Sequence, residues 1–197
     1  MTAPAPVLMV HGIWDTAERF EPMRAALHRG GITRTRAITL QPNNGSIPIA
    51  SMATQVQHAV DALATEHGTT RIDLVGFSMG ALVARYYLQR LGGRERVRRY
   101  VSISGPHAGT MNAFFSWVAA GREMRPRSEL LQDLARDEAP WGDVEVHSWI
   151  TPWDVMIVPA QSGFLPGTRT RAFPVAMHRF MITDSRVLDA LVETLRA

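Results

Sequence analysis

The sequence contains no cysteine among its 197 residues. Disulfides, thiolate-bound metal ions and a cysteine nucleophile are therefore excluded, so any nucleophilic chemistry must use another residue type. No stretch approaches the ~20 apolar residues that a membrane-spanning helix needs, so we expect no integral membrane association. The chain also lacks internal repeats and low-complexity tracts, which favours an ordinary folded protein.

The start of the sequence does not resemble an export signal. Residues 1–6 are too few and too rich in proline, and the apolar run at residues 7–10 is typical of a core strand. We therefore expect a cytoplasmic protein, or a secreted one if an export segment has been removed from the chain. With 46% hydrophobic residues the chain can bury one sizeable core, which predicts a single α/β domain over residues 1–197.

The net charge of +3 owes much to an arginine-rich run at residues 94–99, which is interrupted by Glu95. No aromatic residues alternate with these arginines, as stacking platforms for nucleic-acid bases would. We interpret the run as a solvated surface turn rather than a nucleic-acid or anionic-membrane patch. The prediction is that nucleic acid is not a partner.

The most informative stretch is residues 71–80, Arg-Ile-Asp-Leu-Val-Gly-Phe-Ser-Met-Gly, in which a short apolar strand precedes Ser78 and a helical run follows. A turn tight enough to lift a serine hydroxyl above a sheet crowds the positions two before and two after it. Gly76 and Gly80 fit there because glycine lacks Cβ. The following helix aims its positive N-terminal end at the oxygen that becomes negative in acyl transfer. Ser78 is thus a candidate nucleophile; the alternative is a turn whose serine merely caps the helix.

Apolar strand-like runs alternate with segments of helical periodicity along the chain. This order predicts an α/β fold, a doubly wound and mostly parallel sheet of about six strands with helices on both faces. The expected strands are residues 7–10, 37–40, 72–75, 100–104, 144–150 and 171–176. The expected helices are residues 20–28, 51–67, 81–88 and 128–134, with N-caps at Ser51 and Ser128, and a last helix capped by Thr183 or Asp184.

The first expected strand leads into His11-Gly12-Ile13-Trp14. In open α/β sheets, ligands bind beyond the carboxyl ends of strands, and a His-Gly pair there lets the next N–H point inward. We therefore assign Ile13 N–H as one oxyanion donor, with Trp14 N–H as a substitute. The other is Met79 N–H, directly after the candidate nucleophile. His11 itself is interpreted as a brace for this loop.

A serine hydroxyl needs a base to remove its proton and a carboxylate to orient that base. His178 and Asp154 fit these roles because both follow expected strands, and serine, aspartate, histidine is a known chain order for such triads. His147 lies inside a strand, and His107, in the loop after residues 100–104, is interpreted as structural. The remaining histidines precede Ser78.

Three other acids compete with Asp154 for the orienting role, namely Asp133, Asp137 and Asp143. We prefer Asp154 because the others lie on a surface helix or before a strand. The candidate substrate-binding residues are Trp14, Phe114, Trp117 and Met177. For the apolar run at residues 113–118, core packing is the default expectation and a rim that receives a greasy acyl chain is the alternative.

These residues resemble the α/β-hydrolase superfamily, and within it the small bacterial lipases and esterases that lack a large cap. The resemblance covers nearly the whole chain and rests on His11-Gly12-Ile13, residues 76–80, residues 106–110, Asp154 and His178. It implies hydrolysis of carboxylic esters through an acyl-enzyme on Ser78, with no cofactor and a small-molecule ester, carrying an apolar acyl chain, as substrate.

Larger relatives carry a long lid and a calcium site. Only ~40 residues separate Ser104 from Val144 here, so we expect neither a lid nor a metal. An acyltransferase or thioesterase using the same triad remains an alternative. A non-catalytic binding protein on the same fold is less favoured, because all three triad residue types are present.

Overall fold

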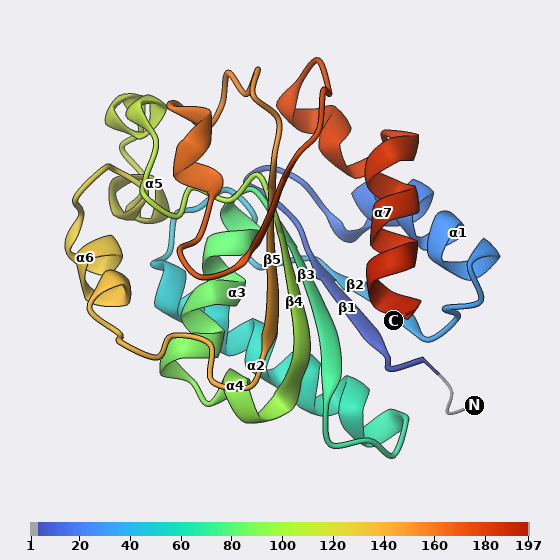
Figure 1. The fold of residues 1–197 in the computed structure, drawn as a ribbon. Helices are drawn as coiled ribbons and strands as arrows, with labels where there is room; N and C mark the ends of the chain where they lie inside the picture. Colours follow the sequence, from blue (N-terminus) through green and yellow to red (C-terminus); the bar gives the residue numbers. More distant parts are fainter. Residues whose placement is uncertain (1–3, 197) are drawn as a thin grey trace.

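A computed structural model describes residues 4–196 and shows a central parallel sheet between two layers of helices (Figure 1). Residues 1–3, part of the segment expected not to be an export signal, lie outside the described residues. The sheet order is β2-β1-β3-β4-β5-β6, and every pairing is parallel. The strands are β1 (Val7–Val10), β2 (Thr35–Ile38), β3 (Ile72–Phe77), β4 (Val97–Ile103), β5 (Glu145–Ile150) and β6 (Arg169–Ala172). The predicted fold class is confirmed.

Helices cover both faces of the sheet, with α1 and α7 on one side and α2 and α3 on the other (Figure 1). The α-helices are α1 (Glu21–Arg29), α2 (Ile49–Glu66), α3 (Met79–Arg90), α4 (Gly93–Arg96), α5 (Ala119–Glu123), α6 (Glu129–Ala135) and α7 (Ser185–Arg196). Short 3-10 helices are η1 (Ala17–Phe20), η2 (Met111–Phe115), η3 (Ala160–Gly163) and η4 (His178–Ile182). None of the helices within residues 4–196 has the length and apolar character needed to traverse a bilayer.

Amphipathic spacing explains how the helices bury their faces. On α7, Val187, Leu191 and Leu195 recur every four residues and are buried against the sheet. Between β4 and β5 the chain forms only η2, α5 and α6, without a large cap. The segment between β4 and β5 therefore consists of short loops and short helices.

The helix caps were predicted with mixed success. Ser128 caps α6 as expected, because its Oγ accepts the Leu131 N–H at 3.3 Å. Ser51 as the cap of α2 is wrong. That helix begins at Ile49, whose N–H donates to the Glu123 carboxylate of α5 at 2.7 Å. A side chain distant in sequence supplies the cap, which no local pattern reveals.

The arginine-rich run is not a solvated turn throughout, because Arg98 and Arg99 lie in β4 and Arg99 is buried. Each arginine of the run meets a carboxylate from another part of the chain, which neutralises its charge. The pairs are Arg94 with Asp137 at 3.6 Å, Arg96 with Asp61 at 3.0 Å, Arg98 with Asp73 at 2.7 Å and Arg99 with Glu145 at 2.8 Å.

The connection from β3 to α3 is crowded as the sequence predicted. A Cβ on Gly80 would lie 2.3 Å from the His11 carbonyl oxygen and 2.4 Å from that of Val10. A Cβ on Gly76 would lie 2.5 Å from the Cα of Ala81. The first turn of α3 therefore packs directly on the backbone at the end of β1.

We expect Gly80→Ala to lower the free energy of unfolding by roughly 2 kcal/mol or more, because overpacking outweighs the gain in helix propensity. Urea unfolding monitored by circular dichroism measures the change. Gly68→Ala is the control, since nothing lies within 4 Å of its added Cβ and only the positive φ of 58° is strained. A Gly80→Ala protein at least as stable as Gly68→Ala would contradict the crowding argument.

Candidate active site

Ser78 occupies a sharp turn between β3 and α3. Its backbone has φ 55° and ψ −127°, a conformation that residues with a side chain rarely adopt. The Ser78 N–H donates to the Ile103 carbonyl at 2.9 Å, which ties the turn to β4. Its side chain makes no capping hydrogen bond to α3, so the cap interpretation is wrong. The hydroxyl is left half-exposed at the carboxyl edge of the sheet.

Two backbone N–H groups beside Ser78 are free. Within residues 4–196, neither Ile13 N–H nor Met79 N–H donates a hydrogen bond, and both residues line one narrow pocket of about 90 Å³ with Ser78. The Trp14 N–H donates to the Asn43 carbonyl at 2.8 Å, so it is not a substitute for Ile13. Both assigned donors are therefore available to an oxyanion.

A buried hydrogen bond joins the two other candidate residues. His178 Nδ1 lies 2.7 Å from Asp154 Oδ2, although Asp154 follows β5 and His178 begins η4. The other carboxylate oxygen of Asp154 accepts the N–H groups of Met156 and Ile157, each at 2.9 Å. Burial acts to raise the pKa of Asp154, but the hydrogen bond and charge of His178, together with the two backbone N–H donors, outweigh it and leave the pKa below its usual value. The carboxylate is therefore ionised beside the imidazole.

Ser78 and His178 line the same wide pocket, which has a volume of about 540 Å³. With Nδ1 bound to Asp154, the His178 Nε2 is the ring nitrogen left for another partner, and the ring packs 4.9 Å from that of Phe77. Within residues 4–196 no hydrogen bond joins Ser78 Oγ to His178. Such bonds often tighten only when a substrate is bound. The arrangement brings an alcohol and an oriented imidazole to one pocket.

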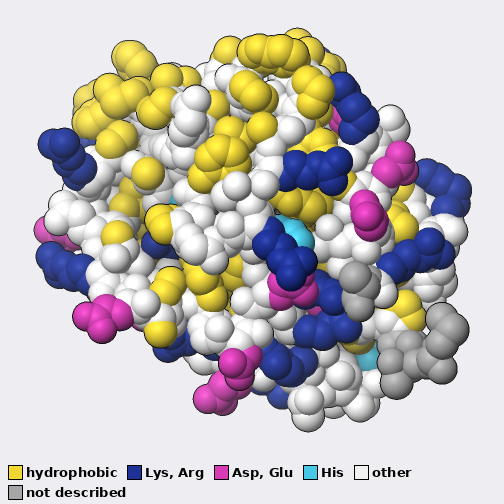
Figure 2. Space-filling view, in the orientation of Figure 1, with side chains coloured by type: hydrophobic (Ala, Val, Ile, Leu, Met, Phe, Trp, Pro, Cys, Tyr) yellow, Lys and Arg dark blue, Asp and Glu magenta, His cyan; other side chains and the backbone are white. Residues whose placement is uncertain are grey.

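The pocket walls differ from the residues expected to bind substrate. Trp14 lines both pockets and Met177 lines the wide one, whereas Phe114 and Trp117 line neither. Core packing as the default for residues 113–118 holds for Ala113, which is buried, but is wrong for Phe115 and Trp117, which are 83% and 81% exposed. Hydrophobic side chains gather along this edge of the molecule, at the top of Figure 2. They are exposed because no further layer of structure covers the loops and short helices here.

The sequence reasoning missed several residues that line the wide pocket, namely Asp15, Arg19, Val155, Met156 and Arg179. Arg179 could have been found from the sequence, because it directly follows the candidate residue His178. Arg19 could not, because it follows the His11 loop on η1 without a recognisable pattern.

Comparison with known proteins identifies the family of this chain. The family model for palmitoyl protein thioesterases matches residues 6–139. The chain belongs to this family. Palmitoyl-protein thioesterase 3 of Dictyostelium discoideum is 25% identical over 149 residues, which cover 73% of this chain and 51% of that protein. A probable alcohol acetyltransferase of Cyberlindnera fabianii is 22% identical, with 95% of this chain and 53% of that protein covered. The chain spans about half the length of these curated relatives.

Solved structures place this thioesterase-family chain in the α/β-hydrolase fold. Mature lipase BlEst2 of Bacillus licheniformis superposes with a TM-score of 0.81 at 13% identity, covering 99% of this chain and 93% of that one. Lipase B of Aspergillus fumigatus gives a TM-score of 0.82 at 15% identity, covering 98% and 53%. Together with the family match, this fold confirms the expected superfamily. The family match contains Ser78 but ends before Asp154 and His178, whose assignment as catalytic residues is therefore a proposal from geometry.

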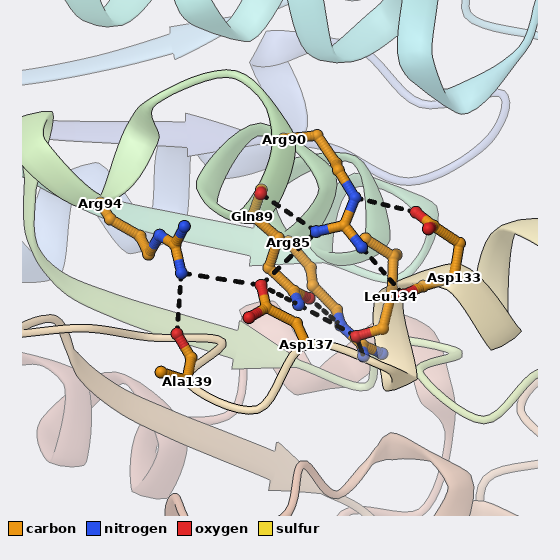
Figure 3. A network of polar contacts seen from close by, with 8 residues as sticks. All are labelled: Arg85, Gln89, Arg90, Arg94, Asp133, Leu134, Asp137 and Ala139. Carbon is orange, nitrogen blue, oxygen red and sulfur yellow. Dashed lines mark hydrogen bonds and ion pairs between the residues drawn. The ribbon is translucent and has the colours of Figure 1, made fainter.

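Two of the three competing acids in this thioesterase-family chain are paired with arginines. Figure 3 shows Asp133 and Asp137 held by arginines between α3 and α6. Arg90 pairs with Asp133 at 2.8 Å, and both Arg90 and Arg94 lie within 4 Å of Asp137, at 3.4 and 3.6 Å. Asp143 is exposed on the surface. Among the acids that the sequence left open, Asp154 is the one hydrogen-bonded to a histidine.

Two other histidines near the site have structural roles, as predicted. His11 is fully buried, with Nδ1 2.6 Å from the Gly12 carbonyl and Nε2 accepting the Leu40 N–H at 2.9 Å. His107 Nε2 lies 2.6 Å from Ser102 Oγ. Burial lowers the pKa of both rings, well below the usual value for His107. Both are neutral braces for the loops that follow β1 and β4.

No cluster of three or more histidine, aspartate and glutamate side chains suited to a metal ion occurs within residues 4–196.

The lowered pKa of Asp154 makes a testable contribution to stability. A carboxyl whose folded pKa is depressed stabilises the fold fully above its unfolded pKa of about 3.9, and this contribution is lost as pH falls through the folded value. We expect the free energy of urea unfolding to fall less steeply between about pH 6 and pH 2 in Asp154→Asn than in the wild type, because this acid limb of the stability curve loses the Asp154 contribution. Asp143→Asn controls for loss of an exposed carboxylate. An acid limb unchanged in Asp154→Asn would contradict the assignment.

Proposed function

We propose that the protein is a serine hydrolase that cleaves small esters and thioesters through an acyl-enzyme on Ser78. The observation that carries this proposal is the buried Asp154–His178 hydrogen bond, in which the histidine lines the same pocket as a strained serine. Membership of the palmitoyl protein thioesterase family supports a thioester as well as an oxygen ester. No cofactor enters the proposed reaction.

In the proposed mechanism, Ser78 Oγ attacks the carbonyl carbon while its proton passes to His178 Nε2. Asp154 accepts the Nδ1–H and stabilises the imidazolium that forms. The N–H groups of Ile13 and Met79 donate to the oxyanion of the tetrahedral intermediate. His178 then protonates the leaving alcohol or thiol, and water attacks the acyl-enzyme by the same route to release the acid.

The two pockets at Ser78 separate the two halves of a substrate. The narrow pocket of about 90 Å³ contains the free N–H groups and apolar side chains such as Ala113, Met124 and Ile157, so it suits the acyl group. The wide pocket contains His178, which must reach the leaving group and the attacking water. This pocket is wide, and the exposed Trp14 lies in its wall. We therefore propose that the acyl group is hydrolysed by water rather than transferred to an alcohol.

Ser78→Ala is expected to lower kcat/KM for p-nitrophenyl butyrate at least ~10³-fold, because the nucleophile is lost while the pocket remains. It should also abolish labelling by a fluorophosphonate probe. Ser51→Ala, an exposed serine on α2, is the control and should label like the wild type. Unchanged turnover and labelling in Ser78→Ala would exclude the proposed mechanism.

The narrow pocket predicts a preference for short acyl groups. Among p-nitrophenyl acetate, butyrate, octanoate and palmitate, we expect the first two to have the highest kcat/KM. Met124→Ala should shift the optimum toward octanoate, because it removes a side chain from the wall of this pocket. Met111→Ala, exposed and outside both pockets, is the matched control. A wild-type optimum at palmitate would show that the acyl chain lies elsewhere.

A further inference from the structure

Two guanidinium groups in the wall of the wide pocket lack close partners. Arg19 Nε is shielded from solvent without a hydrogen bond, and the nearest carboxylate oxygen, Asp15 Oδ1, is 3.7 Å away. Its NH2 group reaches the Arg179 carbonyl only at 3.5 Å. The Arg19 side chain is 38% exposed, so solvent reaches part of its guanidinium group, but the buried Nε is poorly satisfied and an additional acceptor beside it would be stabilising.

The Arg179 guanidinium is still less engaged. It is exposed to solvent and lies 4.8 Å from the centre of the Phe180 ring, and within residues 4–196 it makes no hydrogen bond or ion pair with another side chain. By contrast, the four arginines of residues 94–99 each meet a carboxylate. At the pocket the pairing is incomplete, although both arginines stand beside the candidate catalytic groups.

The charge balance of this wall favours an anion. Of the residues that line the wide pocket, Asp15 carries one negative charge while Arg19 and Arg179 carry two positive ones. Guanidinium groups present planar pairs of donors that match the oxygens of carboxylate and phosphate. The narrow pocket has no charged residue in its wall. An anionic group on a substrate is therefore attracted to the leaving-group side of Ser78.

We propose that Arg19 and Arg179 form an anion-binding subsite, and that preferred substrates carry a phosphate or carboxylate on the alcohol or thiol that leaves. The inference rests on the proposed function, because it assigns the leaving group to the wide pocket. It assigns a binding role to two residues outside the triad and the oxyanion loop. It also narrows the substrate class from neutral esters to acyl esters of anionic alcohols and thiols.

The test compares substrates that share one acyl group. These are 1-butyrylglycerol and its 3-phosphate, with propyl butyrate and 3-(butyryloxy)propanoate as the carboxylate arm. The readout is the ratio of kcat/KM for the anionic ester to that for its neutral partner, which cancels any loss common to both. We expect this ratio to exceed about ten in the wild type in at least one arm, through KM more than kcat. The arm with the larger ratio identifies the anion.

Variants locate the effect. Arg19→Gln and Arg179→Gln should each lower the ratio, and the double variant should bring it near one, whereas Asp15→Asn should raise it. Arg29→Gln removes the same charge from the exposed surface of α1 and should keep the wild-type ratio. A ratio near one in the wild type, or one unchanged in the double variant, would overturn the subsite.

A binding measurement separates this inference from the proposed function. Calorimetry on Ser78→Ala with the intact esters should show tighter binding of the anionic partner, and loss of that difference when Arg19 and Arg179 are also replaced. This result would support the subsite even if the wild type turned over none of the esters. Equal affinities for neutral and anionic esters would reject the subsite even if Ser78 were confirmed as the nucleophile.

Discussion

The close approach of α3 to the end of β1 is the constraint on which the site depends. Because Gly80 has no side chain, the first turn of the helix can rest against the carbonyl oxygens of Val10 and His11. Gly12 passes over the serine so closely that a Cβ there would lie 2.9 Å from the Ser78 Cβ. These approaches bring the loop after β1 and the start of α3 to the same side of the hydroxyl, where the free N–H groups lie.

The strained backbone conformation of Ser78 is maintained because the surrounding structure holds it in place. The turn is held from one side by the hydrogen bond of Ser78 N–H to Ile103, and from the other by Ala81 N–H, which donates to the Ser78 carbonyl at 3.0 Å. β3 is buried along its whole length, so the strand before the turn cannot relax toward solvent. A rigid sheet supports a strained residue whose relaxation would require several packed elements to move.

The sequence predicted the fold and the candidate triad because both leave local signals. The periodicities of strands and helices can be recognised in consecutive residues. The glycines around Ser78 reflect crowding within one turn. The residues placed after strands, Asp154 and His178, are hydrogen-bonded in the structure. Their positions were predictable because the carboxyl ends of parallel strands lie at one edge of the sheet.

The remaining features depend on contacts between distant segments. Ile49 starts α2 because Glu123 reaches it across 74 positions, and the Arg98 charge is neutralised by Asp73, 25 positions away. The exposure of Phe115 and Trp117 depends on what the fold leaves uncovered above the sheet. Such pairings and exposed surfaces depend on the path of the whole chain, so they cannot be predicted from composition and residue spacing.

The charged side chains around the site lie at different depths below the surface of the wide pocket. The side chain of Asp154 is 1% exposed and does not line the wide pocket, so its negative charge acts through His178 rather than on the substrate directly. Arg19 and Arg179 lie in the pocket wall itself. An anionic leaving group would therefore meet the guanidinium groups, with the imidazole between it and the buried carboxylate. This order allows one pocket both to stabilise an imidazolium and to attract a negatively charged substrate.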